Sequence, residues 1–230
     1  SQRFTMGEII LSARKIQKSY TNGHDRLYVL NDLSLNVKKS EIITLMGQSG
    51  SGKSTALNIL GTLDTPDTGS VEIDGVDIIN LNDDELSRLR NQDIGFVFQF
   101  HHLLPEFSAI ENVLIPTWIN NKNSMMEYAL YLFESLGLYD RKNHLPNQLS
   151  GGERSRVALI RGIINKPKIL FADEPTGNLD VKNSMKLIDL LRKINEDLEQ
   201  AIVLTTHNPE IASHGHKKYV LDKGVLKNMN

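Results

Sequence analysis

Residues 47–55 read GQSGSGKST, and this stretch decides the fold. It fits the pattern GxxxxGK[ST], in which glycines let backbone N–H groups point at phosphate oxygens and a lysine reaches the terminal phosphates. An apolar run, EIITLM (41–46), precedes it, and a helical pattern (53–61) follows it. A strand, a glycine-rich loop and a helix in this order predict a phosphate-binding P-loop. The alternative, a glycine-rich surface turn, does not explain the strand and helix on either side.

The predicted phosphate site takes in the whole loop. Lys53 is expected to contact the β and γ phosphates, and Ser54 to coordinate magnesium. The residues assigned here to nucleotide binding are Gly47, Gln48, Ser49, Gly50, Ser51, Gly52, Lys53, Ser54 and Thr55.

More apolar runs of the same kind follow along the chain. They are IGFVF (94–98), KILFA (168–172), AIVLTT (201–206) and KYVLD (218–222). They lack polar alternation, which is typical of strands covered on both faces, and a helical pattern (183–198) lies between two of them. These runs predict an α/β fold with a parallel sheet.

Two other regions differ from this core. The segments EIILSARKI (8–16), YVLNDLSLNV (28–37) and SVEIDG (70–75) have the alternation of short strands in a small antiparallel sheet. The segments SAIENVLIPTWI (108–119) and SMMEYALYLFESLGL (124–138) have helical patterns, the second ending at Gly137. We therefore expect a helical subdomain after the second core strand.

The run ILFADE (169–174) ends in two carboxylates. A strand of a parallel sheet would place Asp173 and Glu174 at the carboxyl edge, where ligands of such folds bind. Asp173 is expected to hold magnesium, and Glu174 to polarise the water that attacks the γ phosphate. An acidic pair after a strand is often only a helix cap, and the P-loop upstream favours the catalytic interpretation.

Composition excludes several classes of protein. The 230 residues carry 26 Lys and Arg against 28 Asp and Glu, a net charge of −2, so nothing indicates a dedicated nucleic-acid binder. The chain has no cysteine, which excludes disulfides and thiolate metal sites. No apolar stretch is long enough to span a bilayer, and the start, SQRFTMGE (1–8), lacks the apolar core of a signal peptide.

The segment LSGGE (149–153) precedes a helical run and resembles the signature motif of ABC ATPases. Backbone amides and a hydroxyl at a helix start suit a γ phosphate. The resemblance implies that Ser150, Gly151, Gly152 and Glu153 contact ATP held by a second subunit, in a homodimer that sandwiches two nucleotides. A solvent-exposed helix cap is the alternative.

Other residues match the same family in order and spacing. The resemblance implies that Gln99 senses magnesium and the attacking water, that His207 contacts the γ phosphate and supports Glu174, and that Asp180 links the two sites of the dimer. Tyr20 lies where the family has its adenine-stacking aromatic residue. A packed core tyrosine is the alternative for Tyr20, and Tyr28 is the less favoured substitute.

The resemblance extends from about residue 9 to 227 and implies one domain over 1–230 with a P-loop NTPase (RecA-like) core. The implied parts are an antiparallel β region at about 8–40 and 69–78, a core at about 41–100 and 153–230, and a helical subdomain at about 101–152. The implied cofactors are ATP and Mg²⁺, with magnesium ligands Ser54, Gln99 and Asp173.

The segment FHHLLPEFSAIENVLIP (100–116) resembles the permease-facing segment of the lipoprotein-releasing (Lol-type) ATPases. The resemblance implies an ATPase that powers a separate permease through the region Gln99 to Phe107 and lies on the cytoplasmic side of the bacterial inner membrane. Exposed Phe100, Leu103, Leu104 and Phe107, mixed with His101 and His102, would receive a short helix from the membrane partner. Internal packing within the helical subdomain is the alternative for any one of these residues.

Some alternatives remain open at this point. Macrolide-efflux and cell-division ATPases share much of the same sequence, and a soluble ABC ATPase without a permease is a more distant possibility. A metal site at the two histidines lacks a third ligand nearby. The sequence also departs from the family at Asn208, where aspartate is usual, and at Ser155, where glutamine is more frequent.

Overall fold

The computed structural model describes residues 8–23, 25–119 and 125–229. The start of the chain and Ser124, the first residue of the second predicted helix, lie outside the described residues. No helix in the described part of the chain combines the length and the apolar character needed to cross a membrane.

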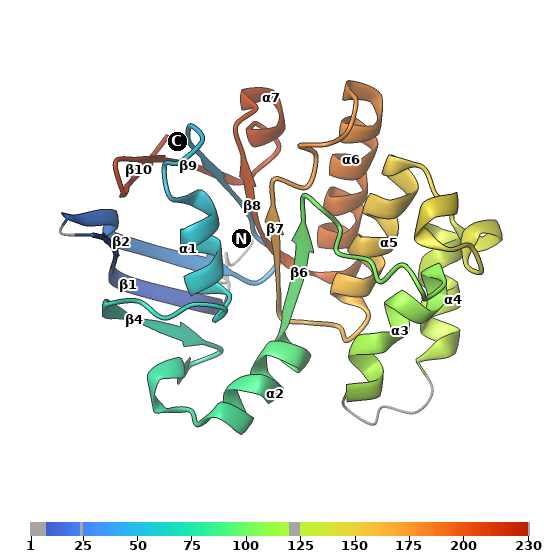
Figure 1. Cartoon of the computed structure of the whole chain (residues 1–230), viewed down its shortest axis with the longest axis horizontal. Coiled ribbons are helices and arrows are strands. Elements are labelled where there is room, and N and C mark those ends of the chain that lie inside the picture. Colours follow the sequence, from blue (N-terminus) through green and yellow to red (C-terminus); the bar gives the residue numbers. More distant parts are fainter. Residues whose placement is uncertain (1–7, 24, 120–124, 230) are drawn as a thin grey trace, which may run out of the picture.

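A six-stranded sheet forms the centre of the molecule (Figure 1). Its strand order is β10-β9-β3-β8-β7-β6. The strands are β3 (Ile42–Met46), β6 (Ile94–Phe98), β7 (Ile169–Asp173), β8 (Ala201–Thr206), β9 (Lys217–Asp222) and β10 (Val225–Asn228). All pair in parallel except β10, which is antiparallel to β9. The predicted parallel sheet is confirmed.

Alternate residues of the central strands enter two different cores. On β7, Ile169 and Phe171 pack with the core that includes α1 (Lys53–Leu60), while Leu170 and Ala172 pack with the core of the later helices. Since both faces are buried, no polar alternation is needed along these strands.

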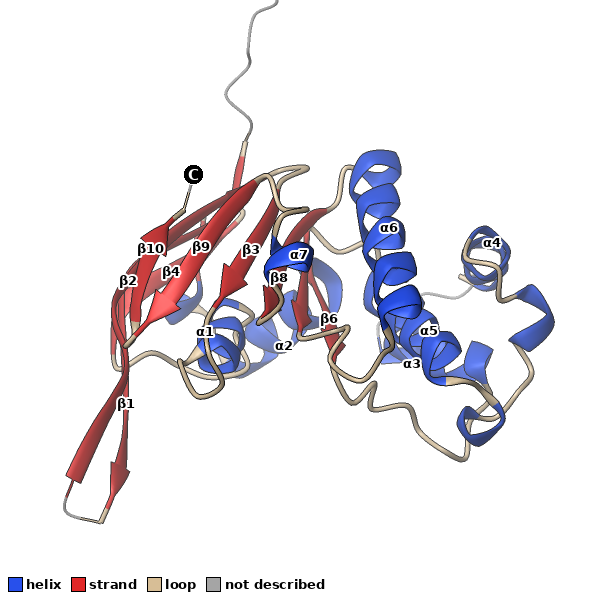
Figure 2. Ribbon diagram, turned by 90° about the horizontal axis from the view of Figure 1, so that it is seen from above, coloured by secondary structure: helices blue, strands red, loops and turns tan. Residues whose placement is uncertain are grey.

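The smaller sheet is antiparallel, as expected, in the order β2-β1-β4-β5. Its strands are β1 (Ile9–Asn22), β2 (Asp25–Lys38), β4 (Thr68–Ile73) and β5 (Val76–Asp77). The expectation of short strands is wrong for β1 and β2, which have 14 residues each. Their pairing extends to a turn at Gly23 (φ +64°) and forms the long hairpin seen in Figure 2. The register shifts at several positions along this hairpin, and the pairing continues beyond each of them.

Helices cover both faces of the larger sheet (Figure 2). Besides α1 they are α2 (Asp83–Asp93), α3 (Ala109–Ile119), α4 (Met126–Ser135), α5 (Gly151–Ile163), α6 (Val181–Leu198) and the short α7 (Pro209–Ala212). Helices α1 and α2 lie in one core and α5, α6 and α7 in the other, while α4 lies farther out, beyond α5. Both predicted helices of the helical subdomain are present as α3 and α4, and Gly137 (φ +66°) follows α4 as expected. The sequence analysis did not predict α2, although Asn82 and Glu85 form a capping box that marks its start.

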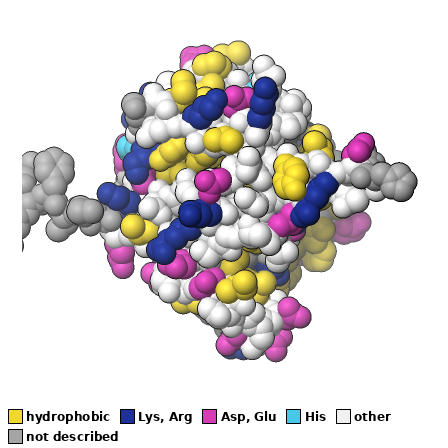
Figure 3. Space-filling view, turned by 90° about the vertical axis from the view of Figure 1, so that its left-hand side faces the viewer, with side chains coloured by type: hydrophobic (Ala, Val, Ile, Leu, Met, Phe, Trp, Pro, Cys, Tyr) yellow, Lys and Arg dark blue, Asp and Glu magenta, His cyan; other side chains and the backbone are white. Residues whose placement is uncertain are grey.

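The face formed by the antiparallel sheet and its neighbours carries mixed charges. Figure 3 shows basic and acidic side chains interspersed across it. Two exposed ion pairs of this sheet join Arg14 to Glu72 at 3.8 Å and Arg26 to Asp67 at 3.3 Å. Such exposed pairs contribute little stability, and they leave no extended surface of one sign over this sheet.

Candidate nucleotide site

The site residues come together because neighbouring strands end at the same level. In the sheet register Met46 lies opposite Thr206, Asp173 opposite Thr205, and Phe98 opposite Asp173. The loops after β3, β6, β7 and β8 therefore leave one edge side by side. This is the carboxyl edge of a parallel sheet, where ligands of such folds bind.

The loop after β3 encloses the ammonium group of Lys53. Lys53 is only 6% exposed, and its Nζ donates hydrogen bonds to the carbonyls of Gly47 (2.7 Å) and Gln48 (3.0 Å). Gly52, at φ +98°, supplies a left-handed conformation directly before α1. A Cβ on Gly47 would lie 2.8 Å from the Leu221 carbonyl oxygen, so only glycine fits there.

The Glu174 carboxylate lies between a lysine and a histidine. Its Oε1 is 3.5 Å from Lys53 Nζ, and its Oε2 is 2.6 Å from His207 Nδ1. The ionised carboxylate can only accept, so Nδ1–H of His207 donates. Glu174 also has a left-handed backbone (φ +45°), an uncommon conformation for a side chain of this type and one found often at functional sites.

Thr205 holds the carboxylate of Asp173 and the backbone of Glu174. Its hydroxyl donates to Asp173 Oδ1 at 2.7 Å and accepts the backbone N–H of Glu174 at 2.9 Å. Thr205 was not among the predicted site residues. Thr205 lies one residue before the end of the apolar run 201–206. Only the strand register shows that this position lies opposite Asp173.

Gln99 is oriented by the loop after Glu174. Its Nε2 donates to Asn178 Oδ1 at 3.3 Å, and Asn178 Nδ2 donates back to the Gln99 carbonyl at 3.1 Å. A Cβ on Gly177 would lie 2.5 Å from Gln99 Nε2, so a larger residue there would displace the Gln99 amide. Asn178 is a second residue that the sequence analysis missed.

These side chains surround a cavity of about 740 Å³. Its lining residues are Val29, Gln48, Ser49, Gly50, Gly52, Lys53, Ser54, Thr55, Gln99, Glu174 and His207. Gly47 and Ser51 line an adjoining hollow, also about 740 Å³, on the side of β9 and β10. The cavity thus brings together most of the predicted loop with the glutamine, glutamate and histidine from three other strand ends.

The LSGGE segment lies elsewhere in the same chain. Ser150 caps α5 in a capping box with Glu153, whose carboxylate accepts the Ser150 N–H at 2.7 Å. That bond and the Arg141 guanidinium at 3.0 Å keep the pKa of Glu153 below its usual value. None of Ser150, Gly151, Gly152 and Glu153 lines the cavity around Lys53.

Asp180 lies beside this turn rather than in the cavity. It caps α6, accepting the backbone N–H of Asn183 at 2.8 Å and its side-chain amide at 2.7 Å, and these bonds lower its pKa. A Cβ on Gly152 would lie 2.9 Å from Asn183 Oδ1. Asp180, Asn183 and Gly152 therefore pack as one unit.

Tyr20, near the end of β1, also lies outside the residues that line the cavity. It is 43% exposed, so it is not a buried core tyrosine. Its hydroxyl donates to Asp64 Oδ2 at 3.0 Å, and Lys18 Nζ, 5.2 Å from the ring centroid, donates to Asp64 Oδ1 at 2.8 Å. Asp64, just after α1, thus fixes the orientation of the ring.

The segment Gln99 to Phe107 is only partly the open apolar surface that was expected. Phe100 (70%) and Leu104 (43%) are exposed, but Leu103 packs against the helical core. The expectation that His101 belongs to this surface is wrong, since its ring turns inward toward Ser155. Burial and the nearby Arg154 hold the pKa of His101 below its ordinary value.

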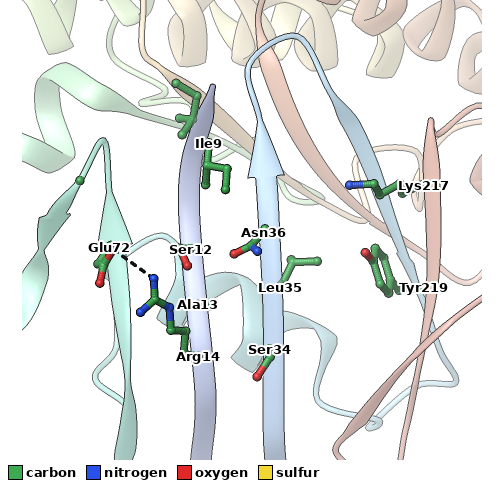
Figure 4. Close-up of a pocket in the computed structure, with 12 residues that line it drawn as sticks. Ile9, Ser12, Ala13, Arg14, Ser34, Leu35, Asn36, Glu72, Lys217 and Tyr219 are labelled. Carbon is green, nitrogen blue, oxygen red and sulfur yellow. Dashed lines mark ion pairs between the residues drawn. The ribbon is translucent and has the colours of Figure 1, made fainter. Parts of the chain in front are cut away.

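Another hollow, of about 610 Å³, lies against the antiparallel sheet (Figure 4). Ser12, Arg14, Asn36 and Tyr219 are among its lining residues. It contains none of the predicted site residues and no P-loop, so it is not the nucleotide site.

The chain is similar to known proteins over almost its whole length. A sequence profile described as ABC transporter matches residues 30–177. The "Lipoprotein-releasing system ATP-binding protein LolD" of Bdellovibrio bacteriovorus is 47% identical over 216 residues, which cover 93% of this chain and 98% of that protein. The protein of the same name from Shewanella oneidensis is 43% identical over 224 residues, covering 96% and 97%.

Solved structures show the same fold. The dimeric bacterial ABC transporter cassette MJ0796 matches with a TM-score of 0.87 and 39% identity, over 96% of this chain and 99% of that chain. A dimeric post-hydrolysis state of the same cassette, bound to ADP and Pi, matches with a TM-score of 0.86, 39% identity and the same coverage.

Proposed function

This chain belongs to the ABC transporter family, and we propose that it is the ATP-hydrolysing subunit that powers a separate membrane permease for lipoprotein release. The observation that carries the proposal is the cluster of Lys53, Glu174 and His207 at the P-loop, in a chain whose near full-length relatives are named for lipoprotein release. We place the subunit peripherally, on the cytoplasmic side of the inner membrane, and treat its three predicted parts as one ATP-binding domain.

In the proposed reaction each residue has a separate task. Lys53 and the loop amides bind the β and γ phosphates of ATP. Glu174 accepts a proton from the water that attacks the γ phosphate, while His207 holds the carboxylate through Nδ1. Gln99, just after the end of β6, orients the water.

Magnesium fits the residues at this edge. Ser54, Asp173 and Gln99 offer a hydroxyl, a carboxylate and an amide oxygen, the hard ligands that Mg²⁺ prefers when it shares its shell with phosphates. The Gln99 amide nitrogen is engaged by Asn178, which leaves the amide oxygen for a cation. Among the described residues no group of three acidic or histidine side chains could hold a metal alone, in keeping with a site completed by phosphate. Bound magnesium would neutralise the charge that develops on the phosphates.

We propose that two copies of the chain close on two nucleotides. Since Ser150 and Gly152 do not line the cavity of their own chain, they can complete a nucleotide site only from a second copy. The close packing of Gly152 against Asn183, which is bonded to Asp180, would carry the motion of the LSGGE turn to the neighbouring site.

Isolation of the native complex from membranes tests the function. Purification through a tag on this chain should recover two further kinds of partner, integral membrane permease chains and bound lipoprotein. Permease chains of a macrolide-efflux or cell-division system would instead assign a different cargo, and a preparation free of membrane proteins would overturn the transport role.

We predict that Phe100→Ser separates the permease from the ATPase. Phe100 is 70% exposed and does not line the nucleotide cavity, so the isolated chain should keep its ATP turnover. The amount of permease that co-purifies with the chain should fall several-fold. Ile79→Ser, at a residue 77% exposed outside this surface, is the matched control. Equal recovery of permease with all three chains would remove Phe100 from the interface.

We also predict that Tyr20→Ala weakens ATP binding by roughly tenfold, because stacking on an aromatic ring contributes about 1–3 kcal/mol per base. Tyr28→Ala, in the paired strand, tests the substitute assignment. Fluorescence titration with a labelled adenine nucleotide measures both. If Tyr28→Ala weakens binding and Tyr20→Ala does not, the assignment of Tyr20 is wrong.

A further inference from the structure

The turn that follows β6 is strained and held in place by a side chain from α5. His101 and His102 both have left-handed backbones, at φ +36° and +49°. Such conformations are unfavourable for non-glycine residues and persist only where the surroundings enforce them. Arg161 of α5 does so by donating to the His101 carbonyl at 2.6 Å and the His102 carbonyl at 2.7 Å.

The His101 ring continues the connection to α5. Its Nε2 lies 3.3 Å from the hydroxyl of Ser155, a residue only 1% exposed. The Ser155 hydroxyl lies 3.0 Å from the Gly151 carbonyl, to which it donates. Because a hydroxyl has one proton, Ser155 must accept from His101, so the proton of the neutral imidazole is on Nε2. His101 Nδ1, the other ring nitrogen, is also buried.

We propose that His101 and Ser155 are a pair of positioning residues that fix the first turn of α5 relative to the loop of Gln99. The proposal rests on the proposed function, in which Ser150 and Gly152 contact the nucleotide of the second copy. Gly151 lies between them, and its carbonyl is the end of the path from His101.

The hydrogen bonds from His101 through Ser155 to Gly151 link two parts of the nucleotide site. Two residues before His101, Gln99 is bonded to Asn178 at the edge of the cavity. The His101–Ser155 contact therefore joins the turn that faces a second copy to the loop that lines the chain's own cavity. Losing the contact should misplace the LSGGE turn and leave ATP binding by the single chain intact.

The test measures dimer formation in the presence of ATP and Mg²⁺, by analytical ultracentrifugation of the full chain carrying Glu174→Gln to prevent turnover. Adding His101→Phe should weaken the dimer roughly fivefold or more, because the LSGGE turn would be correctly placed in only a fraction of the chains and the dimer needs two such chains. His101→Gln, whose amide can donate in place of Nε2, should restore at least half of the lost affinity. His144→Phe, at a half-buried histidine of the helical subdomain, is the control.

Ser155→Ala provides an independent variant, and it should add little to His101→Phe if the two residues act through one contact. Affinity of the single chain for ATP and the Tm are measured for every variant, and both should stay close to the parent. A dimer unaffected by His101→Phe and by Ser155→Ala would overturn the inference. The inference would also be overturned if His101→Gln weakened the dimer as much as His101→Phe and both variants had a lower Tm. Failure of the Glu174→Gln parent itself to dimerise would instead overturn the proposed nucleotide sandwich.

Discussion

Replacement of Glu174 by glutamine should reduce ATP turnover by roughly 10²- to 10⁴-fold, the range that a positioned general base contributes. The amide cannot accept the proton of the attacking water. It is almost the same size as the carboxylate, and Lys53 keeps its two carbonyl partners, so the loop should keep its structure. Phosphate release under saturating ATP gives the turnover number.

ATP binding separates this effect from a damaged site. Glu174→Gln should bind ATP at least as tightly as the parent, because removing the carboxylate removes a negative charge 3.5 Å from the ammonium that meets the phosphates. The same substitution at Glu196, exposed on α6, is the control and should change neither quantity. Parental turnover in Glu174→Gln would show that another group is the base.

Replacement of Lys53 by methionine should weaken ATP binding by roughly tenfold to a hundredfold, because hydrogen bonds from a charged donor contribute about 1.5–3 kcal/mol. The loss of the ammonium also leaves Glu174 without its 3.5 Å partner, so an unscreened carboxylate would face the phosphates. Isothermal titration calorimetry with ATP and Mg²⁺ measures the affinity.

Lys186→Met is the matched control for this experiment, since Lys186 is exposed on α6 away from the P-loop. Its affinity for ATP should equal that of the parent. Lys53→Met leaves two P-loop carbonyls without a donor, which could disturb the fold. Circular dichroism of both variants therefore checks that they are folded. An unchanged affinity in Lys53→Met would contradict the proposed role of the loop.

The sequence predicted the features that depend on neighbouring residues. The strand before Gly47, the glycine-rich loop and the helix from Lys53 are local, and each has a distinct pattern. The carboxyl edge also followed from the sequence, since parallel strands that end in polar residues bring those residues together.

Features that depend on distant residues could not be predicted in this way. Thr205 is linked to Asp173 only through the register of β7 and β8, and Asn178 to Gln99 only through the meeting of two loops. His101 was assigned to the outer surface because its neighbours are apolar and aromatic, whereas the left-handed turn reverses its direction. The backbone conformation at His101 determines where its ring lies, and no periodic sequence pattern predicts that conformation.

The left-handed backbone of Glu174 has a consequence for the evolution of this protein. Glycine would adopt φ +45° without the penalty that a Cβ brings, so the fold alone would favour glycine at this position. In the proposed function Glu174 is the base, so a Glu174→Gly exchange that relieved this backbone strain would also remove the proposed proton acceptor. Selection for an unstrained backbone and selection for turnover would then favour different residues at this position.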